Sequence, residues 1–215
     1  MRDSLTLNGV VLQTQPVGEY DKRLVLLTTE RGRITAFARG ARRPKSPLIA
    51  ASNPFVFASF TLYEGRDAYT LVQADVKEYF AELSGKYPGV FYGFYFLEVA
   101  AWYTREGREA AGIVNLLFVA LRALLRERQS VRLIRSIFEL RMLAENGEYA
   151  YSEGDSRDPE VRKALYYAAA APIGRLYALQ LSEEAEREFS STVERLFRRS
   201  CDKSFKSLAV IKEMK

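Results

Sequence analysis

The sequence contains no histidine and only one cysteine, Cys201, among its 215 residues. The absence of histidine excludes the Ser-His-Asp and Cys-His arrangements of nucleophilic enzymes, and it also excludes zinc sites that use imidazole ligands. A single cysteine can form neither an intramolecular disulfide nor a zinc site made of several thiolates. This usage predicts a protein of the reducing cytosol.

The sequence also lacks long hydrophobic runs. Its most apolar stretches, 90–103 and 113–125, are shorter than a membrane span of about 20 residues, and Glu98 and Arg122 interrupt them. The first ten residues show no sustained apolar segment of the kind found in secretory signals. We therefore expect a soluble, cytoplasmic protein that does not associate with membranes.

The composition is that of a folded protein, with 48% hydrophobic and 27% charged residues. We find neither an internal repeat nor a low-complexity segment, and the length suits one large domain or two small ones. The net charge of +5 and the pI of about 9.3 modestly favour a polyanionic partner.

The first 80 residues are predicted to form β-strands. Short runs rich in β-branched and aromatic residues are expected at 5–12, 24–29, 33–39, 55–63 and 69–76. Pro16 and Gly18 are expected to close the first run, and Gly32 to turn a tight hairpin with a positive φ. Five short strands without a long helix between them predict a small closed barrel.

The third run alternates cleanly. Ile34, Ala36 and Ala38 are expected on one face, and Arg33, Thr35, Phe37 and Arg39 on the other. In the fourth run, Val56, Ala58, Phe60 and Leu62 are expected to face the core.

After Phe80 the hydrophobic pattern becomes helical. Apolar residues recur at i, i+3, i+4 and i+7 over 113–125 and over 134–142, with Gly147 as a plausible C-cap. Asp158 followed by Pro159 predicts a helix start, as does Ser182, and a last short helix is expected to carry Phe205, Leu208 and Ile211. We therefore predict an α+β protein with a β-barrel at 1–80 and an all-α helical domain at 81–215.

The strongest chemical signal is an excess of positive charge between Lys22 and Lys45, where eight basic residues occur with one acidic residue, Glu30. Because strand residues two apart share a face, Arg33, Phe37 and Arg39 form a cation–aromatic–cation row. Single-stranded nucleic acids bind to such platforms, since cations neutralise phosphates and a ring stacks on a base. The loop 40–47, stiffened by two prolines, adds three cations.

Two other interpretations of this region remain open. Charged residues on the outside of a half-exposed strand are often only solvated, and a barrel of this kind accepts RNA as readily as DNA. A nuclease would need clustered carboxylates for metal ions, and no such cluster coincides with the basic residues.

Three segments resemble the RecO family of recombination mediators. The run Gly40–Ser46 (GARRPKS) is similar to a stretch of that family. Tyr20–Thr28, followed by Gly32 and Ile34, is similar to its second and third strands, and Phe205–Leu208 (FKSL) matches a short signature near its C-terminus. The resemblance implies an OB-fold followed by helices in a nucleoid-associated, non-enzymatic protein. It further implies binding of single- and double-stranded DNA, annealing of complementary strands, and cooperation with RecR in loading RecA onto strands coated by single-strand-binding protein.

On this basis we predict a set of DNA-binding residues and no cofactor. The set comprises Lys22, Arg23, Arg33, Phe37, Arg39, Arg42, Arg43, Lys45 and Ser46. Tyr63 and Tyr69 are further rings expected near this face. Many members of the family carry a four-cysteine zinc module, but the corresponding stretch here, 143–158, contains five acidic residues and no cysteine. We expect a solvated acidic loop there and no metal site.

A second group of arginines lies near the junction of two predicted helices. Arg122, Arg126, Arg132 and Arg135 are candidates for binding the acidic C-terminal tail of single-strand-binding protein, which the resemblance places on the helical domain. The alternative is that these arginines only cover a solvent-facing helix surface. Seven aromatic residues between 91 and 103 are expected to pack in the helical core: Phe91, Tyr92, Phe94, Tyr95, Phe96, Trp102 and Tyr103.

Overall fold

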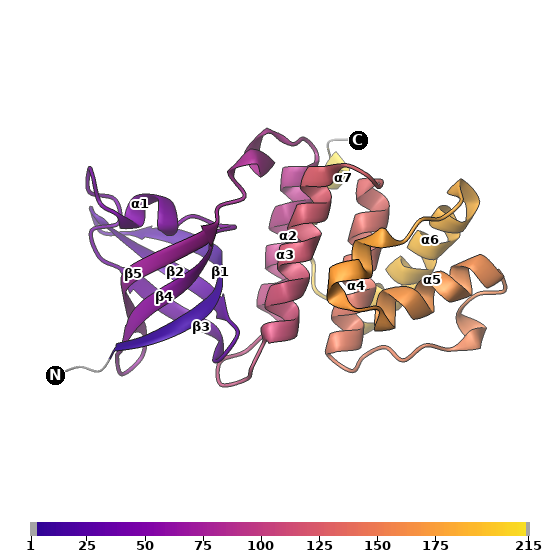
Figure 1. The fold of residues 1–215 in the computed structure, drawn as a ribbon, viewed down its shortest axis with the longest axis horizontal. Helices are drawn as coiled ribbons and strands as arrows, with labels where there is room; N and C mark the ends of the chain where they lie inside the picture. Colours follow the sequence, from indigo (N-terminus) through magenta and orange to yellow (C-terminus); the bar gives the residue numbers. More distant parts are fainter. Residues whose placement is uncertain (1–3, 214–215) are drawn as a thin grey trace. The chain divides into compact units, whose positions relative to one another are not determined.

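The N-terminal part of the protein is a closed five-stranded barrel (Figure 1). A computed structural model describes residues 4–213, apart from the side chain of Lys212, so residues 1–3, which we searched for a signal segment, lie outside the described range. The strands are β1 (Ser4–Val17), β2 (Asp21–Thr28), β3 (Gly32–Ala38), β4 (Phe57–Glu64) and β5 (Tyr69–Glu78), and a short helix α1 (Leu48–Ala51) follows β3. They close in the order β1-β2-β3-β5-β4, which confirms the predicted OB-fold barrel.

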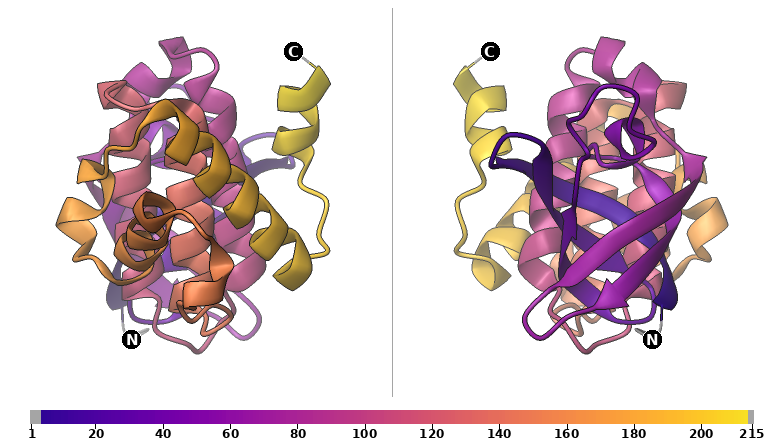
Figure 2. Two further views of the ribbon diagram at one scale, coloured as in Figure 1. Left: turned by 90° about the vertical axis from the view of Figure 1, so that its right-hand side faces the viewer. Right: turned by 90° about the vertical axis from the view of Figure 1, so that its left-hand side faces the viewer.

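The alternation predicted for β3 is confirmed, since Ile34, Ala36 and Ala38 are buried and the residues between them are half-buried. The inward-facing residues of all five strands form one hydrophobic core, which includes Leu24, Leu26 and Phe60. The right-hand view of Figure 2 shows the strands curving into the barrel. The outward-facing residues of each strand are not part of this core, so they can be polar or charged.

β1 is longer than predicted, because it continues through Pro16 to Val17. The strand pairs with β4 only over Ser4–Val10, and after a bulge near Leu12 it pairs with β2 alone. Pro16 thus lies where β1 has a neighbour on one side only, and a missing backbone N–H is tolerated there. The turn itself falls at Gly18–Tyr20.

The predicted hairpin turn at Gly32 is confirmed, with a φ of 66°. This glycine is also required by a close approach, since a Cβ atom there would lie 2.2 Å from the carbonyl oxygen of Arg105. The backbone N–H of Arg33 donates to the same oxygen at 3.3 Å, and the N–H of Gly107 donates to the carbonyl of Arg31 at 3.0 Å. The loop around residues 104–110 therefore packs against the β2–β3 hairpin.

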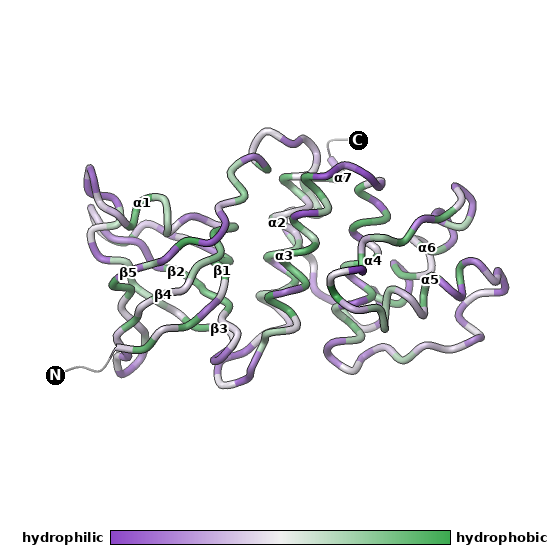
Figure 3. The backbone as a smooth tube through the Cα atoms, viewed as in Figure 1, coloured by the Kyte–Doolittle hydropathy of each residue, from purple (hydrophilic) through white to green (hydrophobic). Residues whose placement is uncertain are grey.

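The helical part contains α2 (Gly89–Tyr103), α3 (Ala111–Arg126), α4 (Val131–Glu145), α5 (Pro159–Ala170), α6 (Glu183–Ser200) and α7 (Lys206–Glu213), with short 3-10 helices at Ala81–Gly85, Glu153–Asp155 and Ile173–Ala178. Figure 3 shows long hydrophobic stretches along α2 and α3. The predicted starts are confirmed, since Asp158 caps α5 and Ser182 caps α6 with their side chains. The N–H groups of Gly147 and Glu148 donate to carbonyls of the last turn of α4.

Most of the aromatic cluster packs as predicted. The Phe96 ring stacks on Phe138 with centroids 4.2 Å apart, and Tyr95 contacts Phe205 edge-on at 5.4 Å. Phe94 and Trp102 differ from the prediction, because their side chains are 38% and 49% exposed. The positions are about two helical turns apart on α2, so they share the solvent-facing side of that helix.

Two compact units can be distinguished by their internal contacts. One comprises the chain up to Ala81 together with Leu97–Val114, and the other comprises Glu82–Phe96 together with the chain from Asn115. The predicted division of the chain near residue 80 thus leaves out the segment Leu97–Val114, which packs with the barrel through the hairpin contacts above. In the part of the chain that the structure describes, no helix is long and apolar enough to cross a membrane.

Candidate nucleic-acid interface

Two proposed DNA-binding residues are neighbours on adjacent strands, on the outside of the barrel. Arg23 of β2 pairs with Phe37 of β3, and both side chains are half-buried. An Arg23 Nη donates to the hydroxyl of Thr35 at 3.4 Å, which holds the guanidinium along this face. A cation thus lies beside a partly exposed ring. The alternation of β3 predicted the outward position of Phe37, but the position of Arg23 beside it comes from the pairing of β2 with β3.

Further residues lie in line with Arg23 and Phe37 on the neighbouring strands. Gln15 of β1 pairs with Arg23, Thr70 of β5 pairs with Phe37, and Tyr63 of β4 pairs with Thr70. Tyr63 is half-buried, so a second ring lies two strands away from Phe37 on the outer surface.

Tyr69, the other ring that we expected near this face, points into the core and is only 5% exposed. Its hydroxyl accepts a hydrogen bond from Arg31 at 3.2 Å, and Arg31 also pairs with Glu64 at 3.0 Å. Burial raises the pKa of the Tyr69 hydroxyl, which therefore stays neutral. Tyr69 is therefore not available to stack on a base, whereas the Arg31 side chain is 43% exposed although it pairs with Glu64.

Arg33 is also engaged within the protein. Its guanidinium donates to the carbonyl of Ala101, near the end of α2, and its backbone is bonded to the following loop. Leu27, which pairs with Arg33 across the sheet, is fully buried although it faces outward from the barrel. The structure therefore covers the Arg33 end of the β2–β3 face and leaves the Arg23–Phe37 end accessible.

The loop after β3 is fixed against the β1–β2 turn. The N–H of Gly40 donates to the carboxylate of Asp21 at 2.7 Å, and the N–H of Arg42 donates to the carbonyl of Tyr20 at 2.8 Å. The Arg42 guanidinium reaches the carbonyl of Gly18 at 3.2 Å. Because these bonds tie two adjacent turns together, the loop has a defined shape that the sequence alone did not predict.

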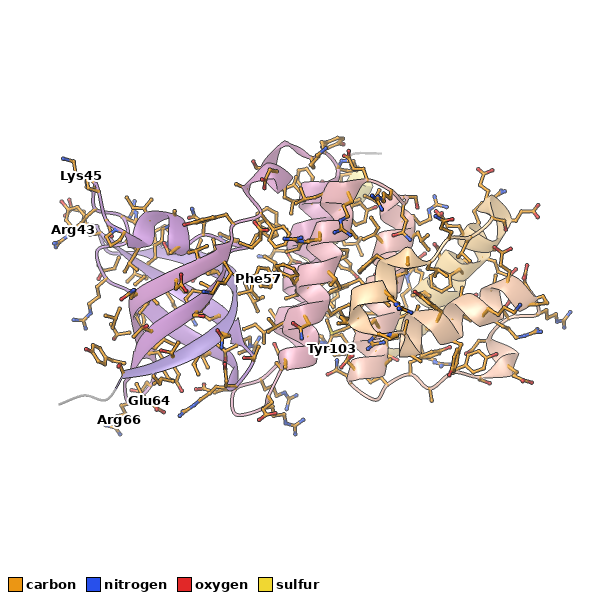
Figure 4. The ribbon with its side chains drawn as sticks, in the orientation of Figure 1. Arg43, Lys45, Phe57, Glu64, Arg66 and Tyr103 are labelled. Carbon is orange, nitrogen blue, oxygen red and sulfur yellow. The ribbon has the colours of Figure 1, made fainter. Side chains whose placement is uncertain are left out.

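The cations of this loop point to solvent. Arg42, Arg43 and Lys45 are exposed, and within residues 4–213 none of them forms an ion pair. Figure 4 shows Arg43 and Lys45 projecting away from the barrel. Lys45 has a φ of 64°, which is unusual for a residue with a Cβ and costs about 1 kcal/mol or more. Strain of this kind is concentrated at functional positions.

The remaining predicted residues surround this loop. Arg39 is exposed directly after β3, whereas the Ser46 hydroxyl accepts the N–H of Leu48 at 3.3 Å and so shapes the start of α1. Lys22 donates to the side chain of Asn53 at 3.0 Å. Partial burial lowers the pKa of the Lys22 ammonium, and the nearby positive charge of Arg42 lowers it further.

Two exposed residues in turns of the barrel were missed by the sequence argument. Tyr20 lies in the β1–β2 turn with its ring under the guanidinium of Arg43, 5.1 Å from the ring centroid. Arg66 lies in the β4–β5 turn, across the barrel from Arg43 and Lys45 (Figure 4). In five-stranded barrels of this topology the β1–β2 and β4–β5 loops flank the ligand face. Their position in those two turns was the signal that could have identified them.

The arginines of the helical unit separate into two sites. Arg122 and Arg126 line a cavity of about 370 Å³ between α3 and the 3-10 helix at Ile173–Ala178, together with Phe118 and Tyr177. The hydroxyl of Tyr177 is buried there and makes no hydrogen bond to any described residue.

Arg132 and Arg135 line a different cavity of about 930 Å³ between α4 and α6. Arg135 pairs with the buried carboxylate of Glu139 at 2.7 Å and lies over the ring of Tyr95. Burial raises the pKa of Glu139, while the Arg135 charge and the bond from the Tyr95 hydroxyl act to lower it. Arg135 therefore has a structural role in addition to any contact with a partner.

The acidic stretch 143–158 is held by hydrogen bonds of its own. Asp155 accepts from the Tyr149 hydroxyl at 2.8 Å and caps the 3-10 turn that begins after Ser152. Asp158 caps α5, and Glu145 pairs with Arg141 at 2.8 Å. Across residues 4–213 no three acidic or cysteine side chains are placed to hold a metal ion, and Cys201 is buried at the C-cap of α6. The residues present do not fit the zinc module of the family.

Comparison with known proteins supports the resemblance. Residues 1–80 match the family model described as "Recombination protein O N terminal". Proteins named "DNA repair protein RecO" are similar in Alkaliphilus metalliredigens (37% identity, 65% of this chain, 56% of the relative) and Desulforudis audaxviator (35%, 65% and 55%). Another in Acetivibrio thermocellus is 23% identical over 98% of this chain and 97% of its own. The chain thus matches little more than half of the length of the first two relatives.

Proposed function

Because the chain belongs to the RecO family, we propose that it is a DNA repair and recombination protein whose barrel binds single- and double-stranded DNA without catalysing a reaction. The proposed contacts are the predicted set from Lys22 to Ser46. Within it, Arg23, Phe37 and Arg39 form the strand surface, and Arg42, Arg43 and Lys45 form the loop surface.

One observation carries this proposal. A partly exposed ring, Phe37, lies beside Arg23 on a barrel whose adjacent loop has a fixed shape and carries three exposed cations. These cations form no ion pair with any residue in the range 4–213. The cations suit phosphates of any sequence, and the ring suits the face of any base. Arg33 is the member of the set with least support, since its guanidinium is already hydrogen bonded to Ala101.

We further propose that the bound strands anneal on this surface. Two complementary strands repel each other, and a basic surface that neutralises both sets of phosphates lowers that repulsion and lets base pairing proceed. Cooperation with RecR, and loading of RecA onto strands coated by single-strand-binding protein, are proposals that rest on family membership alone.

The acidic tail of single-strand-binding protein is proposed to bind the cavity lined by Arg122 and Arg126. The two arginines supply charge for carboxylates, and Phe118 and Ile173 supply an apolar wall for a hydrophobic end. Since Arg126 and Arg132 line different cavities, reversing the charge of one arginine at a time can show which cavity binds the tail. Arg126→Glu should weaken binding of an acidic tail peptide while sparing naked DNA, and Arg132→Glu serves as its comparison.

The decisive experiment measures the annealing rate of complementary oligonucleotides, both naked and coated with single-strand-binding protein. Annealing is monitored by the fluorescence quenching of labels at the strand ends. The proposal expects the protein to accelerate annealing of naked and of coated strands. If neither rate rises above that without protein, the proposed function is wrong. If naked strands anneal and coated strands do not, the DNA surface stands and the partner assignment fails.

An RNA-binding barrel is the second candidate, because cations suit phosphates and rings suit base faces, which RNA and DNA share. Competition between DNA and RNA oligonucleotides of one sequence distinguishes the two, and stronger binding of RNA would favour the alternative. The same oligonucleotides incubated with Mg²⁺ test for a nuclease, for which strand cleavage would be the positive result.

A further inference from the structure

We infer that Tyr20 is a base-stacking residue of the proposed DNA site and that its ring makes this part of the site selective for unpaired bases. The inference rests on the proposed function of the barrel. It adds a ring on the β1–β2 turn to the rings of Phe37 and Tyr63 on the strands.

Tyr20 is an aromatic residue at the surface for which the barrel core offers no explanation. Its side chain is 39% exposed, in a turn between two strands whose inward-facing residues are fully buried. The guanidinium of Arg43 lies over the ring at 5.1 Å from its centroid. A cation on an aromatic ring and an exposed remainder of that ring provide a phosphate contact and a stacking surface side by side.

The ring is also fixed with respect to the loop cations. The backbone carbonyl of Tyr20 accepts the N–H of Arg42 at 2.8 Å, and the adjacent carboxylate of Asp21 accepts the N–H of Gly40 at 2.7 Å. A base that stacks on Tyr20 therefore meets the cations of the loop without a rearrangement of either turn. Such preorganisation lowers the entropy lost on binding.

The side chain stays a neutral phenol in the relevant pH range. A hydrogen bond to Glu19, together with slight desolvation, raises the pKa of the Tyr20 hydroxyl. A neutral ring beside Arg43 does not repel phosphates, whereas a phenolate would.

Stacking and charge make different demands on the nucleic acid. The loop cations attract phosphates of single strands and duplexes alike, but a ring can stack only on a base whose face is free. Removing the ring should therefore weaken single-strand binding roughly 5- to 150-fold, the range for the loss of one stacked base, and leave duplex binding almost unchanged.

A purely structural role for Tyr20 makes another prediction. If the ring serves only to hold Arg43 and the loop in place, its loss displaces the cations, and binding to single strands and to duplex falls together. The two roles can thus be separated by one comparison.

The experiment measures binding of a mixed-sequence oligonucleotide and of its duplex to the Tyr20→Ala, Tyr20→Phe and Tyr20→Trp variants of the 215-residue chain. Tyr79→Ala is the matched control, because Tyr79 is a similarly exposed tyrosine (47%) that follows β5 and has no place in the proposed site. We expect a selective loss of single-strand affinity for Tyr20→Ala, near-normal binding for the other two rings, and no effect for the control.

Photo-crosslinking of an oligonucleotide that carries 5-iododeoxyuridine, with mapping of the modified peptide, gives an independent readout. A crosslink at Tyr20 is expected. Equal losses for single strand and duplex in Tyr20→Ala, or no loss for either, would overturn the inference. Failure of the unaltered protein to bind either ligand would instead refute the proposed function.

Discussion

The loop Arg42–Lys45 gives the sharpest quantitative prediction. Replacing Arg42, Arg43 and Lys45 together by alanine should flatten the dependence of single-strand affinity on salt. Each phosphate contact contributes about 0.7 to the slope of log affinity against log salt, so three lost contacts lower the slope by about 2.1. When salt rises fourfold, from 50 to 200 mM, both proteins lose affinity. The loss factor of the variant should be about 18 times smaller than that of the unaltered protein.

The structure makes these three positions suitable for the test. The side chains are exposed and form no ion pair within the described part of the chain, so their removal leaves no buried charge without a partner. The backbone bonds of Gly40 and Arg42 to the β1–β2 turn do not depend on the side chains and should preserve the shape of the loop.

The assay is fluorescence anisotropy of a labelled oligonucleotide at five or more salt concentrations. A matched control removes three exposed cations of the helical unit, at Lys163, Arg175 and Arg195, which changes the net charge equally. If the loop variant and the control show the same slope, net charge rather than the loop governs binding. An unchanged slope together with an unchanged annealing rate in the loop variant would refute the assignment of this loop.

Three further predictions concern the framework. Glu139→Ala should lower the unfolding free energy, measured in urea, by about 3–5 kcal/mol, because it leaves Arg135 without its buried partner. The double variant Arg135→Met with Glu139→Leu should lower it less, and an equal loss for the single and the double variant would contradict this account. Gly18→Ala should lower stability by about 1–2 kcal/mol through its positive φ alone, whereas Gly32→Ala should lower it further because the new Cβ would overlap a carbonyl; thermal unfolding ranks the two. Arg33→Ala should cost about 1.5–3 kcal/mol of stability with little change in salt slope, and a slope change of about 0.7 would show instead that this side chain binds phosphate.

The sequence by itself determined the architecture and the location of the charge. The strand β3 and the helices α3 and α6 could be predicted because each buries one face. A buried face makes hydrophobic residues repeat every two positions in a strand and every 3.6 in a helix. Capping by Asp158 and Ser182 was equally local, since one side chain bonds to a backbone N–H two or three residues away. The excess of cations from Lys22 to Lys45 and the family resemblance needed no coordinates.

Tertiary structure decided which of those residues share an accessible surface. It bound Arg33 to the end of α2, turned Tyr69 into the core and brought Tyr20 under Arg43. It also divided the arginines near the α3–α4 junction between two cavities, so that Arg126 and Arg132 do not form one site. These outcomes depend on contacts between residues distant in sequence, such as the bonds between the β1–β2 turn and the loop after β3, and no local pattern encodes them.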